Sequence, residues 1–405
     1  MSTDRKDRIT ESDVTGLKYL DRVLPLFERL RPVGCKRDAA GNRELFFDQY
    51  CALVLLYLFN PTITSLRGLQ QASELKKVQR KLGCARSSLG SLSEATRVFD
   101  PELLREIVGE LLERAPVQSG HDRRLADLAH TLTAVDGSLL KTLPQITQAC
   151  FQTRRDRGWR LHTHFEILKG VPVQATLTDA SGSKSANEKA VLRQTLEPDR
   201  CYVTDRGYEM FSLFNAIVDA GSSYVCRVRN DHHFHADEVR EISEEARAAG
   251  VLEDAVGRLG SEKSKRIEHP HHAVRRIVVH VDPHPKRGGR KRKAATHDLV
   301  IATSLLDVPA EVIALIYRHR WMVELFFRFL KHVLGCRHLL SQNPQGIEIQ
   351  TYCAIIACLL ISLLTGRKPT LRTYEMLCHY FSGLADEEEL LAHLNRLKPH
   401  NQAIT

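Results

Sequence analysis

The segment IYRHRWMVELFFRFLKHVLG, residues Ile316 to Gly335, places one acid and several bases in an otherwise hydrophobic stretch. No proline or glycine interrupts it before Gly335, so the pattern predicts a single helix that ends at this glycine. Side chains three, four and seven residues apart share one face of a helix. The apolar residues fall on one side, and the opposite polar stripe spans about 60°, with one further base about 20° outside it. The stripe consists of Tyr317, Arg320, Glu324, Lys331 and the outlying Arg328.

This polar stripe has two interpretations. One is a solvent-exposed amphipathic face, whose Arg–Glu pair stabilises the helix by only about 0.2–0.5 kcal/mol. The other is a carboxylate, Glu324, that binds a metal ion while the flanking bases hold phosphate groups. The segment alone favours the first interpretation, because one acid cannot bind a pair of divalent ions. The second interpretation therefore requires further acids elsewhere in the chain.

The composition indicates a soluble globular protein with an acidic partner. The 405 residues are enough for two or three domains, and the 43% hydrophobic and 26% charged content is ordinary. A net charge of +9 favours a polyanion, nucleic acid first. The block KRGGRKRK, Lys286 to Lys293, carries six of these charges, and the balance without it is only +3. Charge alone therefore suggests nucleic acid and does not establish it.

The cysteines and the apolar runs predict a cytoplasmic, nucleoid-associated protein with no membrane partner. The ten cysteines are scattered without a C-x-x-C pair, which argues against a zinc ribbon and suits a reducing cytosol. The start, MSTDRKDRIT, lacks an apolar signal core. The longest apolar run, Cys353 to Leu364, is too short to span a bilayer and is expected to form a buried core helix.

Changes of pattern along the chain divide it into five predicted regions. A helical N-terminal domain, residues 1–124, includes helices at 46–59 and 64–83; it fits a DNA-binding helix-turn-helix and an ordinary helical bundle equally well. Residues 125–230 carry strand patterns at 131–140, 162–170, 171–180, 200–208 and 222–231, with a helix at 209–221. Residues 231–305 form a basic, strand-rich segment with strands at 273–281 and 297–306. Residues 306–340 contain the striped helix, and 341–405 a helical C-terminal region.

Two aspartates in the strand-rich part are candidate partners for Glu324. Asp136 in TAVDGS and Asp205 in YVTDRGY each follow an apolar strand run and precede a glycine closely. A strand gives the carboxylate a rigid mount, and the following turn leaves it at an open edge. Each one alone has an ordinary explanation: Asp-Gly is a common turn, and an aspartate before a helix is a common N-cap.

Taken together, Asp136, Asp205 and Glu324 resemble the catalytic triad of the DDE transposases encoded by bacterial insertion sequences. The striped helix matches the pattern Y-x2-R-x3-E-x6-K without a gap, which is similar to the motif of the insertion-sequence-four family. The resemblance covers residues 125–335. It implies an α/β fold with an RNase H-like catalytic core, in which two acids lie on strands of a mixed sheet and the third on a late helix.

The family resemblance also accounts for the spacing of the acids. The interval from Asp205 to Glu324 is much longer than the interval from Asp136 to Asp205, which fits a strand-rich insertion at 231–305. In well-studied relatives this insertion carries a tryptophan that takes a flipped base. The two tryptophans of this chain, Trp159 and Trp321, lie outside it. A hairpin-forming pathway is therefore not implied.

The chemistry implied by the resemblance is metal-dependent cleavage and joining of DNA. Three converging carboxylates can hold two Mg²⁺ ions about 4 Å apart, with Mn²⁺ as a substitute. The expected substrates are double-stranded inverted-repeat ends of a transposon and target DNA, bound by a homodimer. The residues expected to contact DNA are Tyr317, Arg320, Lys331, Arg328 and Arg206.

Two other functions compete with this one, and two weaker sites accompany it. A basic DNA-binding protein without activity, or an inactivated copy, would need no triad; an RNase H-like nuclease would cut without joining. Asn187-Glu188 could add a fourth polar group near the metals, although a solvated helix start is the simpler interpretation. A zinc site is the weaker interpretation of two histidine groups: His232, His233 and His235, and His269, His271 and His272.

Overall fold

The computed structural model describes residues 23–32, 43–118, 122–141, 158–179, 187–260, 269–281, 297–332, 339–341 and 343–396. The basic segment 286–293 and Gly335 lie outside these ranges. Seven cysteines fall within them, and all seven are buried free thiols, as their scattered positions predict.

The N-terminal part is helical, as its sequence predicts. Its helices are α3 (Leu24–Glu28), α5 (Phe47–Phe59), α6 (Leu66–Ser73), α7 (Lys76–Leu82), α8 (Leu89–Val98), α9 (Glu102–Arg114) and α10 (Arg123–Ala126). The prediction of one helix over 64–83 is wrong, because the chain breaks between α6 and α7. The hydroxyl of Ser73 donates to the carbonyl of Gln70 and accepts from the amide of Ser87, so this side chain competes with the helical backbone.

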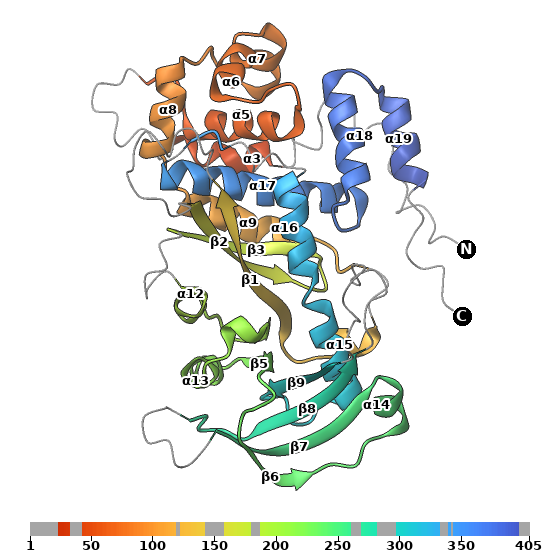
Figure 1. Ribbon diagram of the computed structural model, residues 1–405. Helices are drawn as coiled ribbons and strands as arrows, with labels where there is room; N and C mark the ends of the chain where they lie inside the picture. The colour runs from red at the N-terminus through yellow and green to blue at the C-terminus, as the bar shows by residue number, and fades with distance from the viewer. Residues whose placement is uncertain are drawn as a thin grey trace, which may run out of the picture.

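The C-terminal part packs back onto the N-terminal helices (Figure 1). Helix α17 (Pro344–Thr365) is long and apolar enough to cross a membrane by length and composition alone, and is longer than the apolar run suggested. It nevertheless packs against α5, α8, α9 and β3, and nearly all of its side chains are buried, which confirms a core helix. Helices α18 (Leu371–Ser382) and α19 (Glu387–Arg396) follow; the Tyr374 hydroxyl donates to the Leu58 carbonyl at 2.5 Å and ties α18 to α5.

A single mixed sheet of nine strands runs through the molecule in the order β3-β2-β1-β4-β5-β9-β8-β7-β6. β1 pairs antiparallel with β2 and parallel with β4, and β4 pairs parallel with β5. The strands of the predicted insertion extend this same sheet from β5 through β9. The strand bounds are β1 Thr131–Lys141, β2 Gly158–Glu166, β3 Val171–Asp179, β4 Arg200–Thr204, β5 Ser223–Val228, β6 Phe234–Val239, β7 Val251–Leu259, β8 Val274–Val281 and β9 His297–Thr303.

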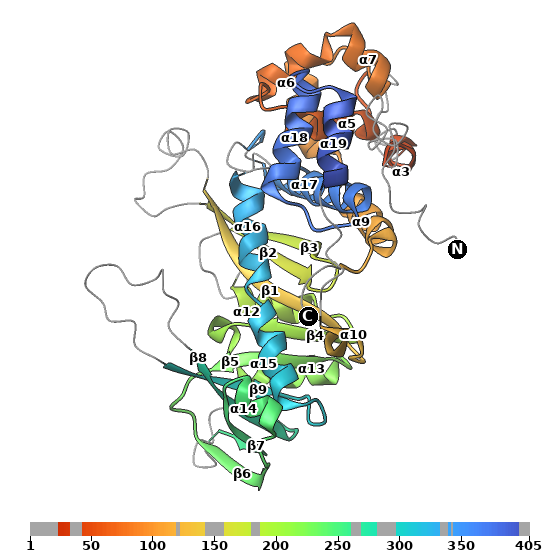
Figure 2. The ribbon, with the colours of Figure 1, turned by 90° about the vertical axis from the view of Figure 1, so that its right-hand side faces the viewer.

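Helices cover both faces of this sheet. Alternate residues of a strand point to opposite faces, so Cys201 and Val203 of β4 join one hydrophobic core while Tyr202 joins another. The first core includes α15 (Ala310–His319) and α16 (Met322–His332), which lie end to end along the sheet (Figure 2). The second includes α12 (Glu188–Gln194) and α13 (Phe211–Asp219).

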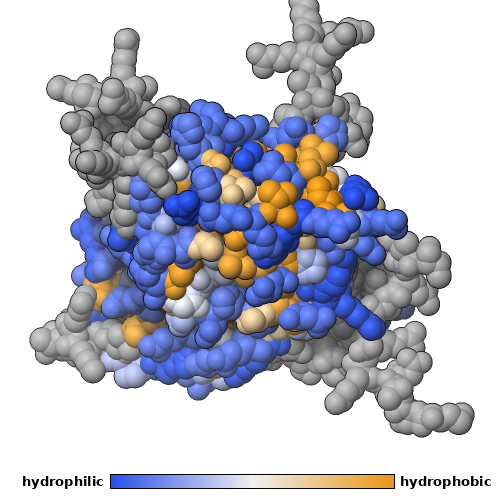
Figure 3. All heavy atoms as spheres, turned by 90° about the horizontal axis from the view of Figure 1, so that it is seen from below, coloured by the Kyte–Doolittle hydropathy of each residue, from blue (hydrophilic) through white to orange (hydrophobic). Residues whose placement is uncertain are grey.

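The far end of the sheet, from β6 to β9 with α14 (Glu244–Ala248), is anchored by a buried ion pair. Arg275 of β8 and Asp254 of β7 are 4% and 5% exposed and lie 2.7 Å apart. One Arg275 nitrogen, Nη1, also donates to the backbone carbonyls of Leu306 and Val308, which lie in the loop before α15. The outer strands are more open: Val239 and Leu252 are exposed, and apolar side chains interrupt the otherwise hydrophilic face seen from this end (Figure 3). Through the hydrogen bonds of Arg275, the strands β6 to β9, which extend the sheet, hold the loop that leads into α15.

The segment from Ile316 onward forms two helices where the sequence predicts one. α15 ends at His319 and α16 begins at Met322. Across the junction the amide of Arg320 bonds to the carbonyl of Tyr317, and that of Val323 to the carbonyl of Arg320, both with the tighter three-residue spacing. α15 packs on β4, β5 and β7, whereas α16 packs on β1 and β3. The break lets the chain follow a twisted sheet from one set of strands to the other.

Candidate active site

Asp136 and Asp205 occupy matching positions on neighbouring parallel strands. β1 and β4 pair with Ala134 opposite Val203. The same register, continued two positions beyond this last pair, brings Asp136 opposite Asp205. Both acids therefore lie on the face that carries Ala134 and Val203, which is the face covered by α15 and α16. The register of β1 and β4 therefore brings together two acids that are far apart in the sequence.

Each aspartate is held by a backbone amide that follows it. Asp136 Oδ1 accepts from the amide of Gly137 at 2.8 Å, and Asp205 Oδ1 accepts from the amide of Gly207 at 2.7 Å. Burial, together with the charges of Asp205 and Glu188, raises the pKa of Asp136 to about 6, although the Gly137 amide and Arg320 oppose the increase. The carboxylates are therefore close enough for each to disfavour the charge of its neighbours.

Arg320 connects Asp136 to Glu324. Its Nη1 lies 3.9 Å from Asp136, and its Nη2 donates to Glu324 at 2.5 Å. Its guanidinium also lies 6.0 Å from the centre of the Tyr317 ring. Burial lowers the pKa of Arg320, but the charges of Tyr317, Glu324 and Asp136 outweigh burial and hold it above its ordinary value. The acid of the polar stripe and the acid of β1 thus meet through one arginine.

Tyr317 lies near Arg320 and Asp205. Burial raises the pKa of its hydroxyl; Arg320 and Arg227 oppose that shift, and Asp205 adds to it. Tyr317, Arg320 and the three acids of the predicted triad therefore share one electrostatic environment. The structure brings these five sequence-predicted residues together.

Glu188 is a fourth carboxylate near Asp136 and Asp205. From the sequence alone, a solvated helix start was the simpler interpretation of this residue. Asn187 caps α12, as expected for a helix start, by accepting from the amide of Ala190. The Glu188 side chain turns inward, and Arg160 of β2 donates to its Oε1 at 2.7 Å. A Cβ atom at Gly137 would lie 2.7 Å from that oxygen, so a larger residue there would force the Glu188 side chain to shift. The feature of the sequence that could have indicated this position of Glu188 is the glycine that follows Asp136.

The hydroxyl of Tyr208 is buried beside these acids. The residue is 1% exposed, and its Oη has no hydrogen-bond partner within the part of the chain that the structure describes. Burial raises the pKa of Tyr208, and Glu188, Asp136 and Asp205 are the charges that add to the increase. An unpartnered buried hydroxyl costs about 1–3 kcal/mol, so its place beside three acids indicates a ligand-binding position.

The donors at this site suit a hard divalent cation, although their present arrangement is not a complete metal site. All are oxygen atoms, which Mg²⁺ and Mn²⁺ prefer. Among the described residues, no three His, Cys, Asp or Glu side chains are placed to hold one ion. Glu324 is 46% exposed and bonded to Arg320. A cation bound here would take ligands from Asp136 and Asp205, and Glu324 would have to leave Arg320 to join them.

The transposase DDE domain family matches residues 127–360, more than half of the 405-residue chain. The chain belongs to this family. The matched range contains Asp136, Asp205, Glu188 and Glu324. Family membership identifies an enzyme class that acts on DNA.

Individual relatives agree with this family. The y4zB protein of Sinorhizobium fredii, named as a transposase, is 26% identical over 210 residues, 52% of this chain and 54% of that protein. A Geobacillus stearothermophilus protein, named as a transposase for insertion sequence element IS5377, is 24% identical over 205 residues, 50% of this chain and 48% of that protein. A Synechocystis protein, named as a transposase for insertion sequence element IS4SA, is 46% identical over 57 residues, 14% of this chain and 17% of that protein. The chain spans about half the length of the first two relatives.

The resemblance to insertion-sequence DDE transposases is therefore confirmed. A solved piggyBac transposase synaptic complex with hairpin DNA aligns with 99% of this chain and 89% of that chain, at 11% identity and a TM-score of 0.41. A score at this level does not establish a common fold.

The other predicted DNA contacts of this DDE-family chain lie outside the acid cluster. Arg206 directly follows Asp205 and is exposed. Arg328 is exposed on α16, and Lys331 is half-buried in the last turn of that helix. Trp321 is 54% exposed at the α15–α16 junction. Arg206 thus lies in the turn after β4, whereas Trp321, Arg328 and Lys331 follow the α15–α16 junction along α16.

Three of the six histidines considered as a weak zinc site bind other partners. His232 bonds to Glu209, His271 lies 3.0 Å from Asp219, and His272 bonds to the Tyr224 hydroxyl at 3.1 Å. No group of three metal-binding side chains occurs in the described ranges. The last two histidines join the turn before β8 to α13 and to β5.

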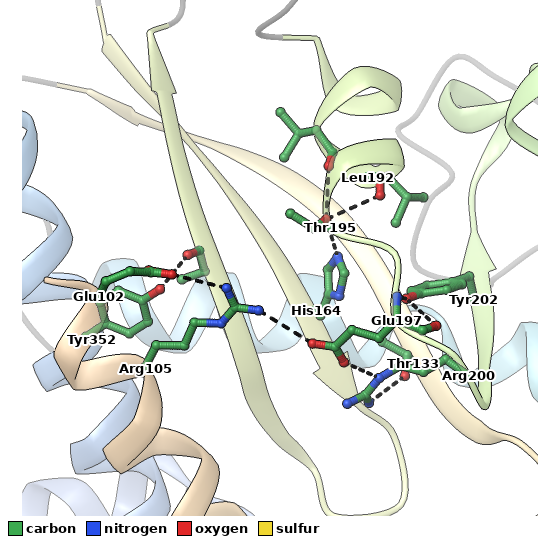
Figure 4. Close-up of polar contacts among 12 residues, drawn as sticks. Glu102, Arg105, Thr133, His164, Leu192, Thr195, Glu197, Arg200, Tyr202 and Tyr352 are labelled. Atoms are coloured by element: carbon green, nitrogen blue, oxygen red, sulfur yellow. Dashed lines mark hydrogen bonds and ion pairs between the residues drawn. The ribbon is translucent and has the colours of Figure 1, made fainter. Parts of the chain in front are cut away.

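A partly buried polar network supports β1 and β4 from the other end (Figure 4). Arg200 donates to Glu197 at 2.7 Å and to the Thr133 hydroxyl at 3.3 Å, and Arg105 of α9 lies 3.6 Å from Glu197. His164 bonds to Thr195 at 3.2 Å. The network ties the helical N-terminal part to the strands that carry the two aspartates. It therefore helps to fix their register.

Proposed function

We propose that this chain is a DDE transposase that cleaves the ends of a transposon and joins the freed 3′-hydroxyl to target DNA. The observation that carries the proposal is the in-register placement of Asp136 and Asp205, with Arg320 linking Asp136 to Glu324. A mixed sheet flanked by helices, with two acids on strands and one on a late helix, supports an RNase H-like core. Residues 231–305 would be the insertion in that core.

Divalent cations, Mg²⁺ with Mn²⁺ as a substitute, would supply charge stabilisation and lower the pKa of an attacking water or hydroxyl. Asp136 and Asp205 give the site its fixed part, because rigid strands and backbone amides hold both carboxylates. Glu324 gives the adjustable part, because it is exposed and held only by Arg320 among its described contacts. Arg320 and Tyr317 are placed to hold a phosphate beside the acids.

The proposed partner is double-stranded DNA. Arg206, Arg328 and Lys331 would extend the contact beyond the scissile bond. Helix α7 adds a second basic surface: Lys76, Lys77, Arg80 and Lys81 are all exposed. Phosphate contacts of this kind position a protein on DNA without reading its sequence. Because two ends must be cut and joined in concert, the proposed active form is a homodimer that bridges two DNA ends.

The test uses DNA carrying the inverted repeats that flank the gene, a plasmid target and Mg²⁺. The wild type should cleave the ends and produce joined products. Asp136→Asn, Asp205→Asn and Glu324→Gln should each reduce cleavage at least about 1,000-fold, which corresponds to about 4 kcal/mol, while end binding persists. Asp219→Asn, an exposed carboxylate on α13, is the matched control and should cleave normally.

The other functions give different results in the same assay. Cleavage without joined product would indicate a nuclease, and binding without cleavage would indicate an inactive DNA-binding protein. Light scattering on the cleaved complex should show two protomers with two ends. One protomer per end that still joins strands would contradict the paired-end arrangement.

A further inference from the structure

We propose that Glu188 is a fourth carboxylate of the active site, which binds a divalent cation together with Asp136 and Asp205. The proposal rests on the proposed function, because it assigns a further ligand to the same cation. It also assigns Arg160 the role of a counter-ion that competes with the cation for Glu188.

The position of Glu188 is the first argument. Its Oε1 lies against Gly137, where a Cβ atom would be 2.7 Å away, and its Oε2 lies 3.7 Å from the corresponding point at Gly207. These glycines follow Asp136 directly and Asp205 by two residues. The Glu188 carboxylate therefore lies beside the backbone that follows each aspartate, which is strand β1 at Gly137 and the short helical turn Arg206–Tyr208 at Gly207. A surface glutamate in the first turn of a helix needs no such space.

The surroundings of the acids are the second argument. Glu188, Asp136 and Asp205 all act on the buried hydroxyl of Tyr208, which has no hydrogen-bond partner within the described residues. A bound cation would relieve the repulsion among the three acids, and a water on that cation could satisfy the hydroxyl.

The third argument separates a cation ligand from a structural ion pair. Arg160 donates to Glu188 at 2.7 Å, but the two side chains are 38% and 26% exposed. A pair this open contributes about 0–1 kcal/mol to stability. This contribution of the Arg160–Glu188 pair is too small to offset the repulsion between Glu188 and the two aspartates. Cation binding gives that arrangement a function.

The test measures binding of Mn²⁺ alone to the full-length protein without DNA, from the loss of the free-ion electron paramagnetic resonance signal. Glu188→Gln should weaken Mn²⁺ binding by at least about 10-fold, the lower end for lost support around a metal. Arg160→Met should strengthen it, because the competing charge is gone. Glu74→Gln is the matched control: it is also a glutamate paired with an arginine, Arg86 at 3.1 Å, but it lies in the helical N-terminal part and should bind Mn²⁺ as the wild type does.

The outcomes separate this inference from the proposed function. If Asp136→Asn abolishes Mn²⁺ binding while Glu188→Gln binds as the wild type does, the inference is wrong and the proposed cation site stands. Equal effects of Glu188→Gln and Arg160→Met would show a structural pair and also overturn the inference. If the wild type binds no Mn²⁺, the proposed cation site itself fails. Glu188→Asp retains the charge, and intermediate binding by this variant would support the inference if the Gln variant does not fold.

Discussion

The guanidinium of Arg320 donates a hydrogen bond to the carboxylate of Glu324, 2.5 Å away. The same guanidinium lies 3.9 Å from Asp136, on the opposite side of the site. One positive group thus lies between two acids that are far apart in the sequence. Coordination of a cation by Glu324 requires this hydrogen bond to be exchanged, and the released arginine is then available to a DNA phosphate.

Arg320→Ala should make the dependence of log affinity on log salt concentration shallower by about one unit, because one phosphate contact is lost. Lys331→Ala should do the same. Arg320→Lys keeps the positive charge but loses the planar guanidinium that can donate two parallel hydrogen bonds. The salt dependence of DNA binding should therefore be unchanged in this variant, whereas the cleavage rate should fall. Filter binding of end DNA between low and physiological salt gives the slopes. If both alanine variants keep the wild-type salt dependence and cleave normally, the polar stripe is an ordinary solvent-exposed face and does not bind phosphate.

His164 should make the protein less stable in acid. Burial lowers its pKa to about 3, whereas a histidine in the unfolded chain titrates near 6.5. The stability that depends on the neutral ring is therefore fully present above pH 6.5 and is lost as pH falls from 6.5 toward 3. Its Nε2 bonds to the Thr195 hydroxyl, which itself donates to the carbonyl of Val191, so the ring nitrogen donates to Thr195.

His164→Gln keeps a donor but cannot titrate. The loss of unfolding free energy between pH 7 and pH 5 should shrink by about 2 kcal/mol in this variant. Urea unfolding at the two pH values measures it. A Gln variant with the full wild-type pH dependence would contradict the role of His164.

Arg275→Met should destabilise the protein by about 3–5 kcal/mol, because it leaves Asp254 charged, buried and without its ion-pair partner. The backbone carbonyls of Leu306 and Val308 lose a donor in the same change. Arg258→Met, on an exposed side chain of β7, should change stability by less than about 0.5 kcal/mol. Denaturant midpoints compare the two variants. A stability loss below about 1 kcal/mol for Arg275→Met would show that the ion pair does not hold the sheet extension.

Local patterns were sufficient to predict the strands that carry Asp136 and Asp205, since each acid directly ends or interrupts an apolar run. The pattern of the polar stripe also predicted the meeting of Tyr317, Arg320 and Glu324. The break after His319 was not predictable, because it depends on which strands each half of the segment covers. A helix pattern contains no information about the twist of a sheet formed by residues far away in the sequence.

The role of Glu188 depends on tertiary structure in the same way. The residues around it form an ordinary helix start, and Asn187 does cap α12. Its approach to the aspartates exists only once β1 and β4 pair and the glycines after the two acids leave room. The histidine groups show the reverse case: zinc binding was the weaker interpretation of their spacing, and His271 and His272 contact Asp219 and Tyr224.

The order in which the chain is synthesised limits when this protein can act. Asp136, Glu188 and Asp205 emerge close together, but Glu324 follows only after the whole sheet extension from β6 to β9 has been made. Helix α17, which packs against α5, emerges later still. Contacts between such distant segments form slowly during folding. A nascent or truncated chain that ends before α16 therefore lacks both Glu324 and the helix that completes the core, so the proposed cleavage would require synthesis to continue beyond α17.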